Sequence, residues 1–196
     1  MEMAAVSLMC HFAVEPESLR LLIQAAKAGD LASFEHIVVL YERSVLRLAQ
    51  RLLPNREMAQ DAAQEVFLRL HGKLGKFQEE KDLGPWLYRI TVNICHDLRR
   101  RVKPGLPLEL APILPDQGLN PEESTLLAQQ RELIAAALDG LTERERDVIV
   151  LRDLEGLSTA EVARILGSTA TTVRSQISTG RVKMKNFVMD QLGRNI

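Results

Sequence analysis

Apolar residues recur every three or four positions along most of this chain, which is the period of an amphipathic α-helix with one buried face. The pattern predicts helices over residues 19–27, 31–52, 56–70 and 85–101, and it resumes at residue 122 and continues to the C-terminus with short breaks. No segment shows the alternation of apolar and polar residues that is typical of a β-strand. We therefore predict an all-α fold.

A proline-rich segment divides the helical pattern into two parts. Residues 103–121 contain five prolines, and proline breaks a helix because its ring fixes the backbone and removes the amide donor. Such a segment is typical of an extended linker between domains. The sequence thus predicts two small helical domains on a tether, with these boundaries: an N-terminal tail 1–18, a first domain 19–102, a linker 103–121 and a second domain 122–196.

The second domain contains two capping boxes, in which a hydroxyl residue and a glutamate three positions later cap the first turn of a helix reciprocally. Thr142 and Glu145 form the first box, and Ser158 and Glu161 form the second. The second box opens a short helix that ends at Gly167, and a longer helix follows at once. A short helix, a tight turn containing glycine and a longer helix are the pattern of a helix-turn-helix.

The longer helix has the composition of a recognition helix, whose N-terminal residues contact base edges in the major groove. The small polar and basic residues near its N-terminus are Thr171, Thr172, Arg174, Ser175 and Gln176. Arg181, Lys183 and Lys185 lie further along and suit phosphate contacts. The alternative is an ordinary three-helix bundle with solvated cations. The two capping boxes and the basic second helix favour DNA binding.

The helix predicted over residues 56–70 carries two distinct faces. Its apolar face consists of Ala59, Ala62, Ala63, Val66 and Leu70. The other face, which we call the acidic stripe, consists of Asp61, Gln64, Glu65 and Leu68 at i, i+3, i+4 and i+7. This stripe suits docking on a basic helical partner. From this stretch alone, a plain solvated face is equally compatible with the pattern.

The helix over residues 85–101 also carries an apolar stripe and a polar face. The predicted buried side consists of Leu87, Ile90, Ile94 and Leu98. The polar side, which we call the reading face, consists of Arg89, Asn93, His96 and Arg100, and Trp86 precedes it by about one turn. Arginine, asparagine and histidine beside an aromatic ring can hydrogen-bond bases, neutralise phosphates and stack on bases. The pattern therefore predicts a helix that is anchored on one side and contacts nucleic acid on the other.

Charge is distributed unevenly, although the whole chain carries a formal net charge of only −1. Residues 86–103 carry five lysines and arginines against one aspartate, and residues 174–196 carry the same balance. Residues 109–161 carry twelve carboxylates against four arginines. The chain therefore has two basic segments and an acidic middle, so any basic surface is local.

The sequence gives no support to an enzyme or a metal site. The only cysteines are Cys10 and Cys95, which excludes a disulfide scaffold, and Cys95 and His96 lack the further ligands that a tetrahedral site needs. There is no Ser-His-Asp or Cys-His arrangement and no glycine-rich phosphate loop. We expect no catalytic activity, no cofactor and no metal.

The sequence also indicates the compartment. No apolar run approaches the roughly 20 residues of a membrane span. The first residues lack the cationic leader of a secretory signal. We expect a cytoplasmic protein without membrane insertion.

Three stretches, taken in order, resemble a known family. They are DAAQEVFLRL, then FQEEKDLGPWLYRITVNICHDLRRR, and after the proline-rich linker LTERERDVIVLRDLEGLSTAEVARILGSTATTVRSQI. Their order resembles that of bacterial RNA polymerase sigma factors of the sigma-70 family, and most closely the extracytoplasmic-function (ECF) class, which has only regions 2 and 4. The resemblance covers about residues 21–185. It implies a factor that binds core RNA polymerase, directs promoter recognition and DNA melting for transcription initiation, and performs no covalent chemistry.

The resemblance also implies roles for individual residues. The residues that match the region 2 motif for docking on core polymerase are Asp61, Gln64, Glu65 and Phe67. The loop from residue 77 to 85 and the following helix match the part that captures a flipped base and holds the −10 element, with Phe77, Trp86, Arg89, Asn93, Asp97 and Arg100. The part that contacts the −35 element corresponds to Thr171, Thr172, Arg174, Ser175, Gln176, Arg181 and Lys183. Promoter DNA and an anti-sigma factor are the further partners that the resemblance implies.

The recognition helix departs from the family pattern. Thr171 stands where the family commonly has glycine, Gln176 stands where it has a basic residue, and Gly180 falls within a run that is commonly rich in histidine and arginine. Glycine inside a helix is expected to cost ~1 kcal/mol relative to alanine. These departures bear on the affinity and sequence preference of the −35 contact and leave the predicted fold unchanged. The alternative function is a conventional helix-turn-helix regulator that binds an operator without core polymerase.

Overall fold

The computed structural model describes residues 16–78, 82–101 and 121–193, and every element within these ranges is helical. The elements are, in chain order, α1 (Pro16–Lys27), α2 (Leu31–Leu52), α3 (Arg56–Lys73), η2 (Leu74–Lys76), α4 (Leu83–Arg101), α5 (Pro121–Asp139), α6 (Glu143–Ile149), η3 (Val150–Leu154), α7 (Thr159–Leu166) and α8 (Ala170–Gly193). The predicted all-α fold is confirmed. The predicted tail and linker lie largely outside the described residues, so their boundaries remain predictions. None of the described helices is both long and apolar enough to cross a membrane.

Several helices differ slightly from their predicted bounds, among them α4, which begins at Leu83 and not at residue 85. α1 begins at Pro16, a residue that suits the first turn of a helix because its missing amide would have no partner there. α3 continues through Gly72 to Lys73, beyond the predicted end at residue 70, and η2 follows directly. A single glycine near the end of a helix is tolerated because it costs only ~1 kcal/mol.

Helices α1–α4 form the N-terminal bundle. Asp30 and Asn55 cap the starts of α2 and α3 by accepting from the backbone amides of Ser33 and Met58, at 3.1 and 2.8 Å. The predicted apolar face of α3 supplies the buried residues Ala59, Ala62, Val66 and Leu70, with Ala63 half-buried. The predicted stripe of α4 supplies the buried residues Leu87, Ile90 and Ile94, with Leu98 half-buried. Burial of this stripe fixes the rotation of α4 and turns its reading face away from the core of the bundle.

Helices α5–α8 form the C-terminal bundle, in which both predicted capping boxes are confirmed. Thr142 and Glu145 cap the start of α6, and Ser158 and Glu161 cap the start of α7. Each box satisfies two amides, and a helix alone leaves its first amides without partners. Between the two helices, η3 is a π-helical turn.

Helices α7 and α8 form the predicted helix-turn-helix. Gly167 follows α7 in the left-handed conformation, with a φ of 61° that glycine adopts without strain. The hydroxyl of Thr169 then accepts from the amide of Thr172 at 3.1 Å in the first turn of α8. The turn between the two helices is therefore short and fixed by local chemistry.

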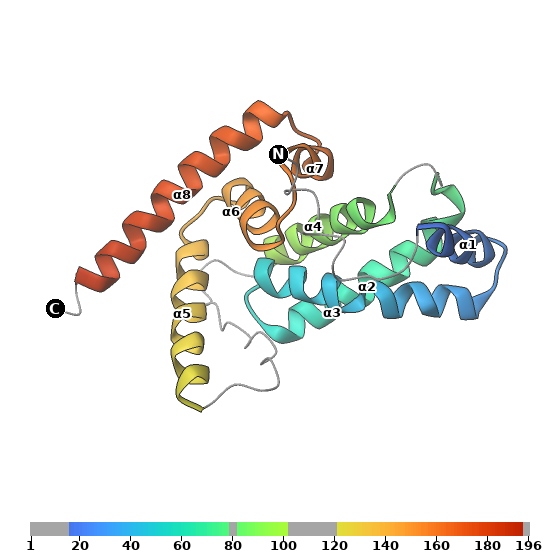
Figure 1. Ribbon diagram of the computed structural model, residues 1–196, viewed down its shortest axis with the longest axis horizontal. Helices are drawn as coiled ribbons and strands as arrows, with labels where there is room; N and C mark the ends of the chain where they lie inside the picture. The colour runs from blue at the N-terminus through green and yellow to red at the C-terminus, as the bar shows by residue number, and fades with distance from the viewer. Residues whose placement is uncertain (1–15, 79–81, 102–120, 194–196) are drawn as a thin grey trace.

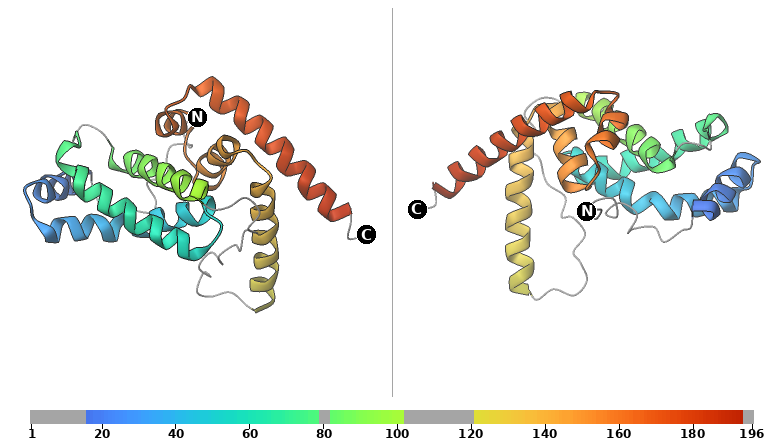
Figure 2. Two further views of the ribbon diagram at one scale, coloured as in Figure 1. Left: turned by 180° about the vertical axis from the view of Figure 1, so that it is seen from behind. Right: turned by 45° about the horizontal axis from the view of Figure 1, so that its top comes forward.

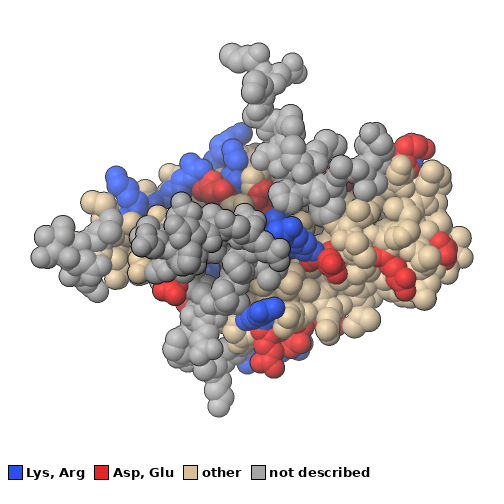
Figure 3. All heavy atoms as spheres, turned by 60° about the horizontal axis from the view of Figure 1, so that its bottom comes forward, with Lys and Arg blue, Asp and Glu red and all other residues tan. Residues whose placement is uncertain are grey.

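The two bundles pack against each other. α4 contacts α2 and α3 on one side and α7 on the other, and η3 contacts α2. Figure 1 shows α4 between the α2–α3 pair and the α6–α7 pair, with the long helix α8 running along one edge of the molecule to the C-terminus; the views in Figure 2 agree. Basic and acidic side chains adjoin on the face drawn in Figure 3. Segments of opposite charge meet between the bundles, where Arg99 and Arg100 of α4 pair with Asp139 and Glu143.

Gly180 lies inside α8 where this helix packs against α6. A Cβ atom at this position would lie 3.0 Å from Cγ1 and 3.3 Å from Cδ1 of Ile149. Ile149 is itself only 2% exposed, so it has little room to move away. The expected propensity cost of Gly180 therefore has a packing reason: the absent side chain lets α8 approach α6 closely.

We predict that Gly180→Leu destabilises the protein and that Gly72→Leu does not. Leucine is a good helix former, so the loss at position 180 reflects overpacking against Ile149 and amounts to about 1–3 kcal/mol. Apart from the chain neighbours and backbone of its own helix, no atom lies within 4 Å of a Cβ at Gly72. Urea unfolding followed by circular dichroism measures both changes. Equal effects from the two substitutions would contradict the packing role of Gly180.

Candidate nucleic-acid interface

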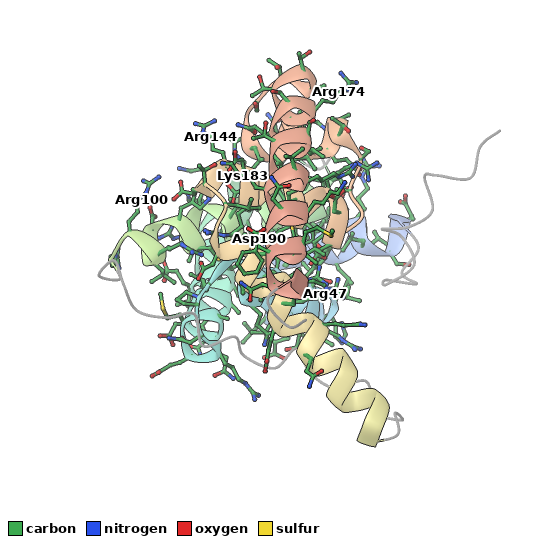
Figure 4. The ribbon with its side chains drawn as sticks, turned by 90° about the vertical axis from the view of Figure 1, so that its left-hand side faces the viewer. Arg47, Arg100, Arg144, Arg174, Lys183 and Asp190 are labelled. Carbon is green, nitrogen blue, oxygen red and sulfur yellow. The ribbon has the colours of Figure 1, made fainter. Side chains whose placement is uncertain are left out.

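The reading face of α4 lies against the C-terminal bundle. Arg89, Asn93 and Arg100 are exposed, as is the neighbouring Asp97, while His96 is half-buried. All four residues of the reading face line a pocket whose other walls include Glu143, Arg144, Asp147, Ile165, Leu166, Ser168 and Gln176. In Figure 4, Arg100 and Arg144 extend on the same side of the molecule. The pocket is therefore shared by the two bundles, and its walls carry both signs of charge.

His96 connects the reading face to α6. Its Nε2 lies 2.9 Å from Oδ2 of Asp147, and its Nδ1 lies 3.4 Å from Oε1 of Glu143. Both ring nitrogens can donate only in the protonated ring, so two carboxylate partners favour the charged form. Burial alone would lower the pKa of His96, but Asp147 and Glu143 outweigh burial and the opposing charge of Arg100, so the pKa is raised above its ordinary value of 6.5.

Two arginines of α4 make further ion pairs across the contact. Arg99 Nη2 lies 2.7 Å from Oδ1 of Asp139, and Arg100 Nη2 lies 3.1 Å from Oε1 of Glu143. Arg99 also donates to the carbonyl of Leu52 at 2.9 Å, which holds it at the end of α2. Both pairs keep contact with solvent, and the side chain of Arg100 is 68% exposed, so each pair contributes at most about 1 kcal/mol.

Glu155 forms a buried cluster with the N-terminal bundle, although it belongs to the C-terminal bundle directly after η3. Its side chain is 1% exposed, and its carboxylate pairs with both Arg47 and Arg51 of α2, the former at 3.2 Å. Tyr88 of α4 donates to the same carboxylate at 3.5 Å, and Arg51 donates to the carbonyl of Leu154 at 2.8 Å. Burial and the charge of Glu155 raise the pKa of Tyr88 to about 12, so its hydroxyl keeps its proton. We call Glu155, Arg47, Arg51 and Tyr88 the Glu155 cluster.

Trp86 and Phe77 stack on each other at the start of α4. Their ring centroids lie 4.9 Å apart with 32° between the planes. Phe77 is 5% exposed and belongs to the core, whereas Trp86 is half-buried. Phe77 is thus placed to support Trp86, and its own predicted contact with DNA would require the core to open. Residues 79–81 of the predicted base-capture loop lie outside the described residues.

The N-terminal turns of α8 present polar residues to solvent. The exposed residues are Thr171, Thr172, Arg174 and Ser175. Gln176 is half-buried and lines the pocket shared with α4. Nη2 of Arg89 lies 3.8 Å from a Cβ placed on Gly167, in the turn before α8. The predicted −10 and −35 surfaces therefore adjoin, and Figure 4 shows Arg174 near the N-terminal end of α8 with Lys183 further along.

Two of the three predicted phosphate contacts of α8, Arg181 and Lys183, are paired within the C-terminal bundle. Arg181 donates to Asp153 from Nη2 and Nε, at 2.6 and 2.9 Å. Lys183 Nζ lies 2.8 Å from Oε2 of Glu145, and this bond together with the one from the Thr142 amide lowers the pKa of Glu145. Both cations keep exposed surface, so a phosphate can reach them in place of these partners.

The acidic stripe of α3 lies on the surface of the N-terminal bundle. Its exposed members are Asp61, Gln64 and Leu68, and Leu68 is 68% exposed. Glu65 pairs with Arg69 one turn further on, at 2.7 Å. Phe67, which the resemblance groups with the stripe, is half-buried and packs against the core. The stripe thus offers carboxylates beside an exposed apolar side chain.

Cys95 takes no part in this interface, although it is adjacent to His96. It is 1% exposed, and burial raises its pKa, so the thiol keeps its proton. Within the part of the chain that the structure describes, no three His, Cys, Asp or Glu side chains are arranged to hold a metal ion.

No motif in the sequence predicts the contacts of the carboxylates that join the two bundles. They are Asp139, Glu143, Asp147 and Glu155. The one signal for them in the sequence is the opposite charge of residues 86–103 and residues 109–161, which favours contact between the two segments. Charge alone does not specify the pairs, because these depend on how the helices cross.

These features define a protein with two helical bundles, one a helix-turn-helix bundle and the other carrying a second surface suited to nucleic acid. A family model described as "Sigma-70 region 2" matches residues 37–104, and one described as "Sigma-70, region 4" matches residues 131–184. The chain is 30% identical over 179 residues to the ECF RNA polymerase sigma factor SigW of Bacillus subtilis, covering 86% of this chain and 95% of that protein.

Two solved structures share the fold. CnrH in complex with the cytosolic domain of CnrY gives a TM-score of 0.68 at 23% identity, covering 87% of this chain and 97% of that one. The sigma factor RpoE in complex with the anti-sigma factor NepR from Bartonella quintana gives 0.64 at 21% identity, covering 81% and 98%. The chain belongs to the ECF class of sigma-70 family sigma factors and is a promoter-directing sigma factor. A conventional helix-turn-helix regulator is not favoured, because the region 2 match accounts for most of the N-terminal bundle.

We predict that the contact between the bundles weakens as the pH rises. In the packed form, burial alone would lower the pKa of His96, but the carboxylates of Asp147 and Glu143 outweigh burial and raise it. Packing therefore takes up protons. The contribution of His96 is complete below its unperturbed pKa of about 6.5 and is lost as the pH rises through the raised value. An NMR titration of the His96 ring measures this pKa.

Two variants separate the contact from general charge effects. Asp147→Asn is expected to lower the pKa of His96. Asp97→Asn removes the same charge from an exposed position next to His96 and is expected to change that pKa far less. His96→Gln identifies the resonance. A pKa of His96 at or below 6.5 in the unmodified chain would show that the contact does not form as described.

Proposed function

We propose that this sigma factor binds core RNA polymerase through the acidic stripe of α3 and contacts two promoter elements through α4 and α8. The observation that carries the proposal is the match to regions 2 and 4, in that order, on two helical bundles that each present a surface of suitable chemistry. The chain itself makes and breaks no covalent bond. Its contribution to initiation is binding, positioning and the stabilisation of opened DNA.

The acidic stripe provides the contact with core polymerase in this proposal. Asp61, Gln64 and Glu65 offer carboxylate and amide groups that suit a basic helical partner, and Leu68 offers an apolar contact at the C-terminal end of the stripe. Phe67 packs under the stripe and keeps α3 in position. Apolar and polar groups side by side on one exposed face are the composition of a specific protein interface.

The reading face of α4 provides the contact with the −10 element. Trp86 can stack on an unpaired base, an interaction worth roughly 1–3 kcal/mol per base. Arg89, Asn93, Asp97 and Arg100 lie on the exposed side of the same helix and can bond bases and backbone of the opened strand. Stacking on an unpaired base also favours melted over paired DNA.

The N-terminal turns of α8 provide the contact with the −35 element. Arg174 can make a bidentate contact with guanine, and Gln176 can do so with adenine. Thr171, Thr172 and Ser175 can bond bases or phosphates beside them. Arg181 and Lys183 can exchange their carboxylate partners for phosphates. Gln176 in place of a basic residue then shifts the base preference of this helix and reduces its electrostatic attraction to DNA.

The linker between the bundles and the expected partners agree with two separate DNA contacts made by one chain. Two weak DNA contacts act together when one polymerase-bound chain makes both, so the free chain is expected to bind DNA weakly and with steep salt dependence. A cytoplasmic location provides access to polymerase and DNA. The sigma factor RpoE of Bartonella quintana is seen with an anti-sigma factor, and we propose that an anti-sigma factor is also a partner of this chain.

The central test is reconstitution of the purified chain with core RNA polymerase, followed by transcription across genomic promoters. We expect transcripts that start at a defined set of promoters and that appear only when both components are present. Absence of any binding to core polymerase would refute the proposed function. Tight binding of the free chain to a palindromic operator would instead indicate a conventional regulator.

Asp61→Lys combined with Glu65→Lys is expected to abolish binding to core polymerase. The two substitutions reverse the charge of the stripe while the buried face of α3 is left intact, so the helical circular dichroism spectrum should not change. Binding is measured by surface plasmon resonance with immobilised core enzyme. The matched control is Glu35→Lys with Glu42→Lys, which makes the same change of charge at exposed positions of α2. Equal losses in the two double variants would show that net charge, and not the stripe, governs binding.

Arg174→Ala is expected to weaken promoter binding by the holoenzyme by about 1–3 kcal/mol and to relax the base preference at one position of the −35 element. Lys185→Ala is the matched control, because it removes one exposed charge further along α8 and should weaken binding evenly across sequences. Sequencing of promoters selected from a randomised −35 pool measures both effects. An unchanged preference in the Arg174 variant would remove this residue from base recognition.

A further inference from the structure

Helix α1 reaches the residue at which the predicted base-capture loop begins, although no predicted site residue belongs to this helix. Lys27, in the last turn of α1, donates from Nζ to the carbonyl oxygen of Phe77 at 3.0 Å. α1 also contacts η2, the short turn that leads into Phe77, and Figure 1 shows α1 beside the C-terminal end of α3. The bond joins residues 50 positions apart, so it depends on the packing of the bundle. α1 thus holds one end of a loop that is predicted to bind DNA.

Phe77 is held at three points. Its amide donates to the carbonyl of Leu74 at 2.9 Å, and its carbonyl accepts from Lys27. Its ring is 5% exposed and stacks on Trp86, with 4.9 Å between the ring centroids. Leu74 and Trp86 flank the loop in the sequence, whereas Lys27 comes from a different part of the N-terminal bundle. The position of the Phe77 ring therefore depends on α1.

The other end of the loop, where α4 begins, is held by different groups. Oδ1 of Asp82 accepts from the amide of Gly84 at 3.1 Å. The ring of Tyr41 packs against the same turn, with Cε1 at 3.9 Å from a Cβ placed on Gly84. These contacts fix the backbone before Trp86. The direction of its half-buried indole depends instead on the ring against which it packs, because a tryptophan side chain has several rotamers on a given backbone.

The bond from Lys27 to Phe77 is well suited to fixing a backbone position. A charged donor forms a shorter and stronger hydrogen bond than a neutral one does. Lys27 is half-buried, so water screens this bond less than it would screen a bond on the open surface. The last turn of a helix also favours a cation, because the helix dipole is negative there. Loss of the ammonium group would allow the backbone at Phe77, and with it the ring, to shift.

We propose that Lys27 is a positioning residue for base capture, because it fixes Phe77 and Phe77 orients the indole of Trp86 toward an unpaired base of the −10 element. The proposal rests on the proposed function, in which Trp86 stacks on that base. Lys27 itself does not touch DNA. An indole that is already ordered binds a base without the entropic cost of ordering it on contact. A misdirected indole loses part of the stacking interaction, which affects melted DNA and not the intact duplex.

The first test observes Trp86 directly in the free full-length chain. Trp86 is the only tryptophan of the chain, so its fluorescence reports on this site without any label. Lys27→Met removes the ammonium group and keeps an unbranched side chain. We expect its anisotropy decay to show a larger fast component, which reports local motion of the indole. Lys27→Arg keeps a cationic donor and should restore the slow decay.

The matched control for this measurement is Arg20→Met, which removes one positive charge from an exposed position of the same helix. This variant should leave the decay unchanged. Urea unfolding followed by circular dichroism shows whether each variant keeps the fold. An identical decay in the unmodified chain and the folded Lys27→Met variant would overturn the positioning role, as would an equal change in the Arg20→Met variant.

The second test measures promoter opening by the reconstituted holoenzyme. The probe is a promoter duplex with 2-aminopurine in the −10 element, whose fluorescence rises when the base leaves the stack. We expect Lys27→Met to slow opening by about three- to tenfold and Lys27→Arg to restore the rate. Affinity for the intact duplex, measured at a temperature at which no opening occurs, should not change. An equal loss of affinity for the intact duplex would indicate general damage to the bundle and overturn the specific role.

A double-mutant cycle tests whether Lys27 acts through Trp86. In a Trp86→Ala chain the residue that Lys27 positions is absent, so adding Lys27→Met should change the opening rate by less than about 1.5-fold. Effects of equal size in the two backgrounds would show that Lys27 acts by another route. This comparison does not depend on the stability of the single variants, because a general loss of stability would appear in both backgrounds.

The outcomes separate this proposal from the proposed function. Failure of the unmodified chain to open promoter DNA with core polymerase would refute the proposed function, and the base-capture role would fall with it. Normal opening by the unmodified chain, together with an equal rate for the Lys27→Met variant, would overturn the role of Lys27 and leave the proposed function standing.

Discussion

The buried carboxylate of Glu155 is the constraint on which the relation between the two bundles depends. A carboxylate with a side chain only 1% exposed is stable inside a protein only if charged or hydrogen-bonding groups replace water. Here α2 supplies Arg47 and Arg51, and α4 supplies Tyr88. Because Glu155 directly follows η3, the same contact fixes how α6 and α7 lie over α4. The site at the junction of the bundles is a consequence of this one requirement.

Helix α4 serves both bundles through different sides. The apolar stripe of α4 is buried in the core of the N-terminal bundle. This burial fixes the rotation of the helix about its axis independently of any partner. The side left over carries Arg89, His96 and Arg100, which are groups that suit DNA, and two of them, His96 and Arg100, also meet the carboxylates of α6. One set of side chains therefore has two possible sets of anionic partners. Nucleic-acid binding and bundle packing are in direct competition for the same atoms.

The features that the sequence predicts well are local. The helices follow from periodicity, and the capping box of Thr142 and Glu145 follows from residues three positions apart. The contact of His96 with Asp147 joins residues 51 positions apart, and neither residue type reveals its partner. Gly180 is a similar case, because the reason for glycine at this position is the close approach of α8 to Ile149 and not helix propensity. The sequence thus predicts the helices and most of the candidate surfaces. It does not predict the contacts between residues that are distant in the sequence, because these depend on how the helices cross.

The packing of the two bundles combines a specific geometry with a small net free energy. Removing Glu155 alone would leave the partly buried Arg47 and Arg51 without their carboxylate partner, which typically costs about 3–5 kcal/mol. Separation of the bundles is different, because both signs of charge return to water together, and the gain of hydration largely offsets the loss of attraction. The exposed pairs of Arg99 and Arg100 add at most about 1 kcal/mol each. The ionic contacts therefore select one arrangement of the two bundles while each contributes little net free energy to it.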